Sequence, residues 1–239
     1  MTLVAASHAP GGLPELGGTI LAGMPWRASV EIASSSPIEI AIRGLVIQDA
    51  YAAISVDGPC TVTTLDVLFE GNGTGLYVVN GGAVTADSCR FNRNEHAIAL
   101  RSGANCAAKD CVIEDSPPTV GAISVMCSYL ELVSCEIRDN QGPAITLYGG
   151  VSSGLHITNC RAIRNSVGLL LFYAGCRIDP TSPESPRSEE SFGTITGWGN
   201  VVPEPNEEDG NMAGAFQVNA PPGETIDLSF LIEPKPEDE

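Results

Sequence analysis

The stretches DCVIEDS (residues 110–116) and SCEIRDN (residues 134–140) decide the fold of this chain, because they are two copies of one repeat. Aligning further copies on both sides of them brings small or apolar residues into one column: Leu45, Val67, Cys89, Cys111, Cys135 and Cys160. From Val67 onward the members of this column follow one another at spacings of 22, 22, 24 and 25 residues. A repeat of this length indicates a stack of similar structural units.

Other columns of the repeat are equally regular. Five residues after the first column stands a polar column: Asn72, Asn94, Ser116, Asn140 and Asn165. An apolar column follows about one short turn later: Ile54, Leu76, Ile98, Ile123, Ile145 and Leu169. Within each copy, apolar residues alternate with polar or small ones, which is the period of a half-buried strand. Each copy therefore holds two or three short strands, and stacking the copies about 4.8 Å apart buries their apolar sides.

Residues 110–116 and 134–140 resemble the repeat of the right-handed parallel β-helix family, the pectate-lyase-like superfamily. The resemblance covers about residues 30–178 and implies an all-β fold, a single-stranded right-handed parallel β-helix of about six or seven coils. This superfamily includes polysaccharide lyases, hydrolases, esterases and epimerases, phage spikes, and β-helices that bind carbohydrate or protein. The resemblance therefore specifies the fold and leaves the function open.

Three segments follow from the extent of the repeat: an N-terminal cap over residues 1–29, the solenoid over residues 30–178 and an acidic C-terminal segment over residues 179–239. Strand candidates in the first and last segments are residues 17–21, 214–218 and 225–232, and residues 180–200 are expected to form a linker or loop. The last 60 residues carry 13 acids and two basic residues, which is -11 of the net charge of -17. The charge is therefore mostly a property of the C-terminal segment.

Composition and charge exclude several classes of function. A net charge of -17 argues against binding to nucleic acid, which needs Lys and Arg against phosphates, and no window is long and apolar enough to span a bilayer. The first ten residues lack the basic start of a secretory signal, and eight Cys without such a signal favour a reducing compartment. We therefore expect a cytoplasmic protein with no membrane and no nucleic-acid partner, or a secreted one if a leader segment preceded this sequence.

The Cys and Asn columns are interpreted as structural. The Cys column, together with Cys106 in a neighbouring column, is expected to face the interior as free thiols that pack like small apolar side chains. The absence of a Cys-x-x-Cys pair argues against zinc. Each Asn is expected at a tight turn, in the left-handed conformation, with its side chain bonded to the backbone of the next coil.

Residues that point outward from the solenoid are the candidates for binding. One outward column reads Asp57, Val79, Arg101, Met126, Tyr148 and Phe172, and Tyr77 lies in the column beside it. Either the C-terminal segment folds over this strip, or the strip binds a ligand. In the second case the predicted ligand-binding residues are Asp57, Tyr77, Arg101, Met126, Tyr148 and Phe172.

Catalytic groups are weakly indicated. Glu95, His96 and Arg101 are candidates for base, acid and charge-neutralising cation, although Glu or His at a turn is commonly a solvated residue. The catalytic motifs of the polygalacturonases and alginate epimerases, and the clustered aspartates that hold calcium in pectate lyases, have no counterpart here. The acidic segment 206–211 lacks the spacing of an EF-hand loop, so no metal and no cofactor are predicted.

These observations favour a non-catalytic β-helix that presents a parallel sheet to a protein or glycan. The alternative is a carbohydrate-active enzyme, a polysaccharide lyase, hydrolase or epimerase, that uses the same face. A subunit of a larger assembly is the third possibility. The acidity of the chain counts against a polyanionic substrate, which it would repel.

Overall fold

The computed structural model describes residues 19–22, 26–119, 121–148, 154–158, 160–166, 169–172, 194–196 and 216–219. Within these ranges every regular element is a β-strand, and the strands pair in parallel to form a solenoid of about six turns. The all-β parallel solenoid predicted from the repeat is therefore confirmed. The described ranges contain no helix long and apolar enough to cross a membrane.

Three parallel sheets form the sides of the solenoid. Sheet A contains β1 (Thr19–Ala22), β4 (Leu45–Gln48), β7 (Leu68–Glu70), β10 (Arg90–Asn92), β13 (Val112–Glu114), β16 (Glu136–Arg138) and β19 (Arg161–Ile163). Sheet B contains β2 (Ala28–Ala33), β5 (Ala52–Asp57), β8 (Thr74–Val79), β11 (His96–Arg101), β14 (Ile123–Met126), β17 (Ile145–Tyr148), β20 (Leu169–Phe172) and β22 (Phe216–Asn219). Sheet C contains β3 (Ile38–Arg43), β6 (Cys60–Leu65), β9 (Ala83–Asp87), β12 (Asn105–Lys109), β15 (Tyr129–Val133), β18 (Gly154–Thr158) and β21 (Thr194–Thr196).

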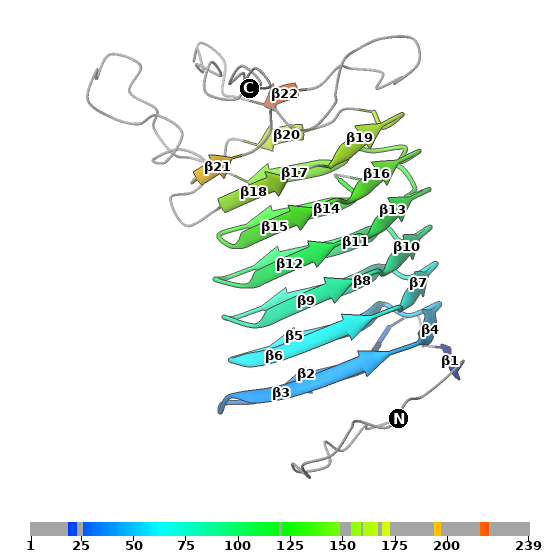
Figure 1. The fold of residues 1–239 in the computed structure, drawn as a ribbon, viewed down its shortest axis with the longest axis vertical. Helices are drawn as coiled ribbons and strands as arrows, with labels where there is room; N and C mark the ends of the chain where they lie inside the picture. Colours follow the sequence, from blue (N-terminus) through cyan, green and yellow to red (C-terminus); the bar gives the residue numbers. More distant parts are fainter. Residues whose placement is uncertain are drawn as a thin grey trace, which may run out of the picture.

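Each coil runs through sheets B, C and A in that order, and each strand pairs with its counterpart one coil away (Figure 1). The register follows the columns of the sequence repeat: Leu76 pairs with Ile98, and Ile98 pairs with Ile123. Like residues are therefore stacked along the axis of the solenoid.

Residues in the left-handed conformation occur at all three corners, and those between sheets B and C include Asn80 and Ser102. Those before sheet A have φ between 51° and 61°: Gly44, Asp66, Ser88, Asp110 and Ser134. Those after sheet A have φ between 52° and 62°: Asp49, Gly71, Arg93, Asp115, Asp139 and Arg164. The Asn column was expected to hold this conformation, and that expectation is wrong by one position, because the residue before each Asn makes the turn. The turn leaves the Asn side chain pointing into the solenoid.

The buried Asn side chains form a ladder along the corner between sheets A and B. The Nδ2 of Asn72 donates to the Ile47 carbonyl at 3.0 Å, and its Oδ1 accepts from the backbone N–H of Ala50 at 3.0 Å. The Oδ1 of Asn94 in turn accepts from the backbone N–H of Asn72 at 3.0 Å. The predicted bonding of Asn to the backbone of the neighbouring coil is therefore confirmed, and it satisfies turn groups that are shielded from water.

Ser116 interrupts this ladder. Its backbone N–H donates to Asn140 Oδ1 at 3.0 Å, but its own hydroxyl is buried and has no hydrogen-bond partner among the described residues. A hydroxyl is too short to reach the carbonyl that an Asn would contact here. The ladder therefore consists of two pieces, one on each side of Ser116.

The interior of the solenoid is filled by the apolar columns. Phe69 and Phe91 stack in adjacent coils with their ring centroids 4.6 Å apart and their planes 8° apart. A Cβ added to Gly75 would lie 2.8 Å from Phe91 Cδ1 and 2.6 Å from the Ala97 carbonyl oxygen. The aromatic stack therefore requires a residue without a side chain at the entrance to β8.

The two ends of the solenoid differ in detail from expectation. Residues 19–22, close to the strand expected at 17–21 in the cap segment, form a strand of sheet A that pairs with β4. Residues 194–196 lie in the expected linker but form β21, which extends sheet C beside β18. Residues 216–219 form β22 next to β20, close to the strand expected at 214–218. The strand expected at residues 225–232 lies outside the described residues.

Coil length varies only at the two corners that border sheet B. Five residues separate the interior column of sheet C from the first column of the repeat in every coil. On entry to sheet B, four residues separate Asn94 from Ile98, whereas seven separate Ser116 from Ile123. On exit from sheet B, the corresponding spacing ranges from seven to ten residues. Insertions therefore flank sheet B on both sides and leave the corner between sheets C and A unchanged.

Candidate functional site

The outward side chains of sheet B form two rows that cross the strands, with one side chain from each coil. The Arg101 row contains Asp57, Val79, Arg101, Met126, Tyr148 and Phe172. The Thr146 row beside it contains Ser55, Tyr77, Ala99, Ser124 and Thr146. The structure therefore brings all the predicted ligand-binding residues onto one face, and the Phe172 side chain lies outside the described set.

The two rows differ in exposure. In the Arg101 row, Asp57 and Arg101 are exposed, and Met126 and Tyr148 are half-buried. In the other row, Thr146 is fully buried and its neighbours Ala99 and Ser124 are nearly so. Asp57 accepts a hydrogen bond from Asn80 Nδ2 at 2.8 Å. The Arg101 row is therefore the part of this face that is open to a partner.

The described residues of the insertion before β14, 117–119 and 121, lie beside the N-terminal ends of the strands of sheet B. Thr119 Oγ1 donates to the Glu95 carbonyl at 3.0 Å, and the Gly121 carbonyl oxygen lies 2.7 Å from His96 Nδ1. A Cβ added to Gly121 would approach Thr146 Oγ1 to 2.5 Å, so this loop packs closely on the Thr146 row. Part of the face is thus covered by an inserted turn of the solenoid itself.

The catalytic candidates are not brought together. Glu95 and His96 lie where the chain enters β11, and Arg101 is its last residue. Five residues at about 3.3 Å each place the Cα atoms of His96 and Arg101 about 16 Å apart. Because a carbonyl only accepts, Nδ1 of His96 carries the proton that it donates to Gly121. The hydrogen bond to Gly121 therefore holds His96 far from Arg101, the cation that was expected to assist it.

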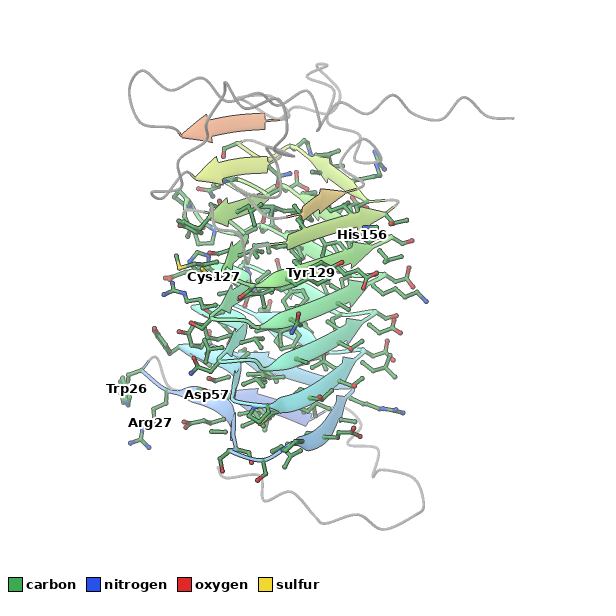
Figure 2. The ribbon with its side chains drawn as sticks, turned by 90° about the vertical axis from the view of Figure 1, so that its left-hand side faces the viewer. Trp26, Arg27, Asp57, Cys127, Tyr129 and His156 are labelled. Atoms are coloured by element: carbon green, nitrogen blue, oxygen red, sulfur yellow. The ribbon has the colours of Figure 1, made fainter. Side chains whose placement is uncertain are left out.

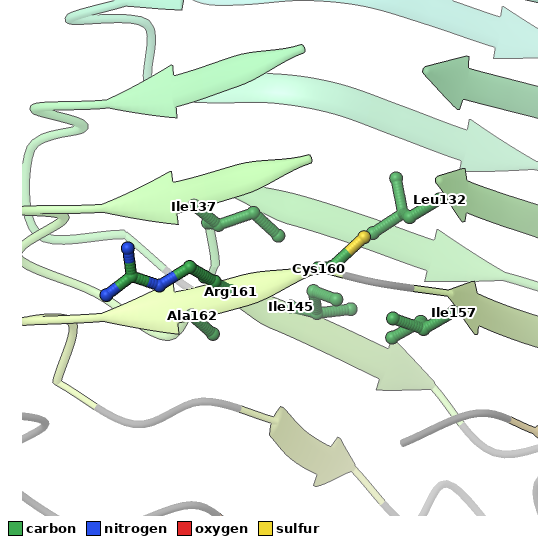
Figure 3. A pocket seen from close by; sticks show the side chains of 7 residues that line it. All are labelled: Leu132, Ile137, Ile145, Ile157, Cys160, Arg161 and Ala162. Carbon is green, nitrogen blue, oxygen red and sulfur yellow. The ribbon is translucent and has the colours of Figure 1, made fainter. Parts of the chain in front are cut away.

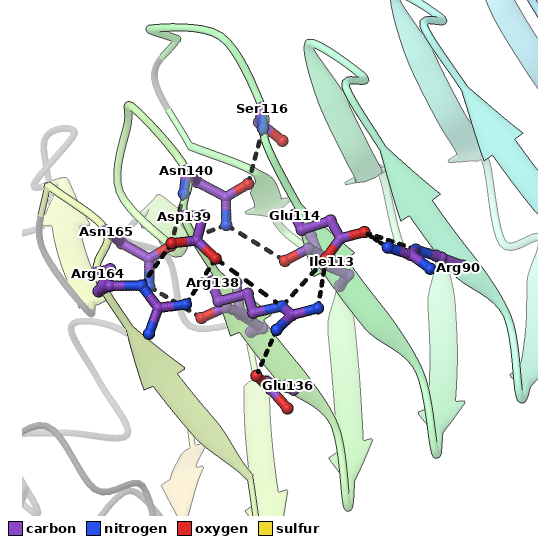
Figure 4. A network of polar contacts seen from close by, with 11 residues as sticks. Arg90, Ile113, Glu114, Ser116, Glu136, Arg138, Asp139, Asn140, Arg164 and Asn165 are labelled. Carbon is purple, nitrogen blue, oxygen red and sulfur yellow. Dashed lines mark hydrogen bonds and ion pairs between the residues drawn. The ribbon is translucent and has the colours of Figure 1, made fainter. Parts of the chain in front are cut away.

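Sequence analysis missed a network of charges on the outer face of sheet A (Figure 4). Glu114 is its centre, with a side chain only 5% exposed. It accepts from Arg90 Nε at 2.5 Å on one neighbouring coil, and from Arg138 Nε and Nη2 at 3.0 and 2.7 Å on the other. The signal was present in part, because Glu114 and Arg138 occupy equivalent repeat positions. Arg90 stands at a different position, opposite Val112, so its pairing with Glu114 depends on how far its side chain reaches between coils.

The network shifts two ionisation equilibria. The Glu114 carboxylate, hydrogen-bonded to Arg138, raises the pKa of that guanidinium. Hydrogen bonds from Arg164 lower the pKa of Asp139, the next acid in the network. Both shifts favour the charged forms, so the network is an internally neutralised array of ion pairs.

A family model described as a right-handed beta helix region matches residues 30–182, which is more than half of the chain. The chain belongs to the right-handed β-helix family. This membership agrees with the solenoid and adds its handedness. Neither the curated proteins nor the solved structures contain a match to this β-helix.

The cysteines of the β-helix behave as expected from their column. Cys89, Cys111, Cys135 and Cys160 are buried and free, and each thiol donates to the carbonyl two residues before it. Burial raises the pKa of Cys106 to about 12, so its thiol stays protonated. The prediction of thiols packed as core side chains is therefore confirmed.

The interior hollow that the described residues line is too narrow to be a binding cavity. It lies under the last coils and is too small for a water molecule. Its walls come from all three sheets (Figure 3): Leu132, Ile137, Ile145, Ile157, Cys160, Arg161 and Ala162. The same ranges hold no cluster of three His, Cys, Asp or Glu side chains suited to a metal ion, and the acidic segment 206–211 lies outside them.

Large apolar side chains are exposed at a few positions that sequence analysis did not single out. Trp26 is 71% exposed, Tyr51 62% and Tyr129 41%. Trp26 projects from the N-terminal end of the solenoid, whereas Tyr129 lies on sheet C (Figure 2). Isolated exposed side chains of this kind are common on protein surfaces, so we assign them no role.

Proposed function

We propose that this β-helix is a non-catalytic binding module that holds a protein partner along the Arg101 row of sheet B. The observation that carries the proposal is the register of the row, which stacks Arg101, Met126 and Tyr148 on three successive coils. Arg, Met and Tyr are enriched at protein interfaces relative to the rest of the surface. A rigid row of such residues suits recognition of a protein better than catalysis.

The corners on both sides of sheet B support this choice. Binding residues are disproportionately found on loops that a rigid scaffold positions. In this chain all variation in coil length borders sheet B, and the corner between sheets C and A is constant. The face with the variable borders is therefore the one we assign to the partner.

Enzymatic activity has weaker support. A general acid or base must lie within hydrogen-bond reach of the reacting group. His96 and Arg101 stand at opposite ends of β11, and His96 Nδ1 is bonded to Gly121. The carbohydrate-active alternative therefore lacks an assembled group of catalytic residues among the described residues.

The test uses Arg101→Ala and Tyr148→Ala, with Thr85→Ala on the exposed face of sheet C as the matched control. A partner captured with the wild-type protein is identified, purified and titrated against each variant. We expect each row variant to bind at least about tenfold more weakly, a loss of about 1.4 kcal/mol, with an unchanged melting temperature. Variants that melt early and still bind normally would show that the row is packing surface. Release of unsaturated or reducing ends from a uronate polymer would instead establish the enzymatic alternative.

A further inference from the structure

Arg101 differs from the arginines of the charge network. Arg90, Arg93, Arg138 and Arg164 all pair with carboxylates of the chain. Arg101 is exposed, and within the described residues its guanidinium has no hydrogen bond or ion pair. The chain thus pairs these four arginines internally, whereas Arg101 on sheet B stays available, as does the exposed Arg161 on sheet A.

The neighbours of Arg101 are apolar on both sides along the row. Met126 is its register partner on the next coil, followed by Tyr148, and Val79 precedes it on the coil below. The nearest acid in the row is Asp57, two coils or about 10 Å away, and its carboxylate already accepts from Asn80. A carboxylate for Arg101 must therefore come from outside the row.

We propose that the partner binds through a segment that carries an Asp or Glu side chain for Arg101, beside an apolar or aromatic side chain that contacts Met126 and Tyr148. This inference rests on the proposed function and specifies the partner's chemistry. The planar guanidinium matches a carboxylate with two parallel hydrogen bonds. Flanking apolar side chains limit the access of water to this pair and so strengthen it.

The order of the row also sets a direction. The large side chains of Met126 and Tyr148 lie on the C-terminal side of Arg101, whereas the smaller Val79 and then Asp57 lie on its N-terminal side. The partner's apolar side chain therefore lies one to two coils, about 5–10 Å, beyond its acid along the solenoid axis.

Long-range repulsion from the acidic chain is reduced at physiological ionic strength, where charges are screened over about 8 Å.

The test is selection of peptides from a random display library on the wild-type protein at physiological ionic strength. We expect the selected sequences to share an Asp or Glu close to an aromatic or aliphatic residue. Arg101→Gln should weaken a selected peptide at least about tenfold, and Arg101→Lys should restore binding only in part, since Lys lacks the planar fork. Arg161→Gln is the matched control, because Arg161 is an exposed arginine on sheet A.

The outcomes distinguish a failure of the acidic specificity from a failure of the proposed protein-binding function. Peptides that require Tyr148 but carry no acid, or that bind Arg101→Gln as tightly as wild type, would overturn the acidic specificity and leave the binding face intact. If the library gives no peptide that depends on this face, both the inference and the proposed protein partner are wrong. Binding to a glycan array without any peptide would assign the face to the other class of ligand.

Discussion

Replacing Glu114 by Gln is the most direct test of how sheet A is held together. The substitution preserves the size of a side chain that is only 5% exposed, but removes the charge shared by Arg90 and Arg138. A Gln has one acceptor oxygen, so its NH2 group must face one of the two guanidinium groups. The arginine on one neighbouring coil therefore keeps its hydrogen bonds to position 114. The arginine on the other coil faces the NH2 group of the Gln, and two donors cannot form a hydrogen bond.

The expected loss of stability in Glu114→Gln follows from the exposure of its two arginine partners. A hydrogen bond to a charged group contributes about 1.5–3 kcal/mol when buried, but the Arg90 and Arg138 side chains are 57% and 33% exposed. Screening by water reduces the contribution of such exposed pairs. We therefore expect Glu114→Gln to lower the free energy of unfolding by about 1–2 kcal/mol, which for a chain of this size lowers Tm by about 2–8 °C.

The assay is thermal and urea unfolding followed by far-UV circular dichroism. Glu136→Gln is the matched control, because Glu136 is 34% exposed and contacts Arg138 at 3.5 Å only. We expect the control to remain within about 0.5 kcal/mol of wild type. If Glu114→Gln unfolds at the same midpoint as the control, the pairs around Glu114 contribute nothing to stability and our interpretation of the network is refuted.

Three further predictions concern packing, hydrogen bonding and pH. Gly75→Ala should destabilise the protein by about 1–3 kcal/mol, because the added methyl group meets the Phe91 ring; an unchanged denaturation midpoint would contradict this. Ser116→Asn should raise the free energy of unfolding by about 1 kcal/mol by giving the backbone N–H of Asn94 an acceptor and removing an unpaired hydroxyl, whereas equal stability of Ser116→Asn and Ser116→Ala would argue against a completed ladder. Asp139 has a pKa below its unfolded value of 3.8, so the stability it contributes is present above that pH and is lost as the pH falls through the lower folded value. The free energy of unfolding of Asp139→Asn should therefore fall less steeply than that of the wild type as the pH drops below about 4. Unfolding curves that keep the wild-type pH dependence would contradict this prediction.

The repeat made the interior of the solenoid predictable from sequence. Residues that stack on one another along the axis share one environment, so Cys89, Cys111 and Cys135 recur in one column and are buried together. The Arg101 row followed from the same periodicity, because alternation places every second residue of a strand outside. Both predictions needed only the spacing of the repeat.

Features that depend on side-chain reach were not predictable in the same way. Glu114 contacts arginines at different repeat positions on two neighbouring coils, so no single column reveals the network. The left-handed turn was placed one residue late, because Asn adopts that conformation readily while in this fold Arg93 and Asp139 adopt it. The hydrogen bond of each such N–H to the next coil helps to offset the cost of that conformation, as for Arg93 with the Glu114 carbonyl at 3.1 Å.

The break in the Asn ladder at Ser116 has a consequence for how the protein unfolds. In a solenoid each coil contacts only its neighbours, so the order of unfolding follows the strength of successive junctions. The junction between the coil of Asn94 and the coil of Ser116 lacks the side-chain hydrogen bonds that join Asn72 to Asn94 and Asn140 to Asn165. We expect amide hydrogen exchange to divide the solenoid into two cooperative units that meet there, so that one end can open while the other stays folded.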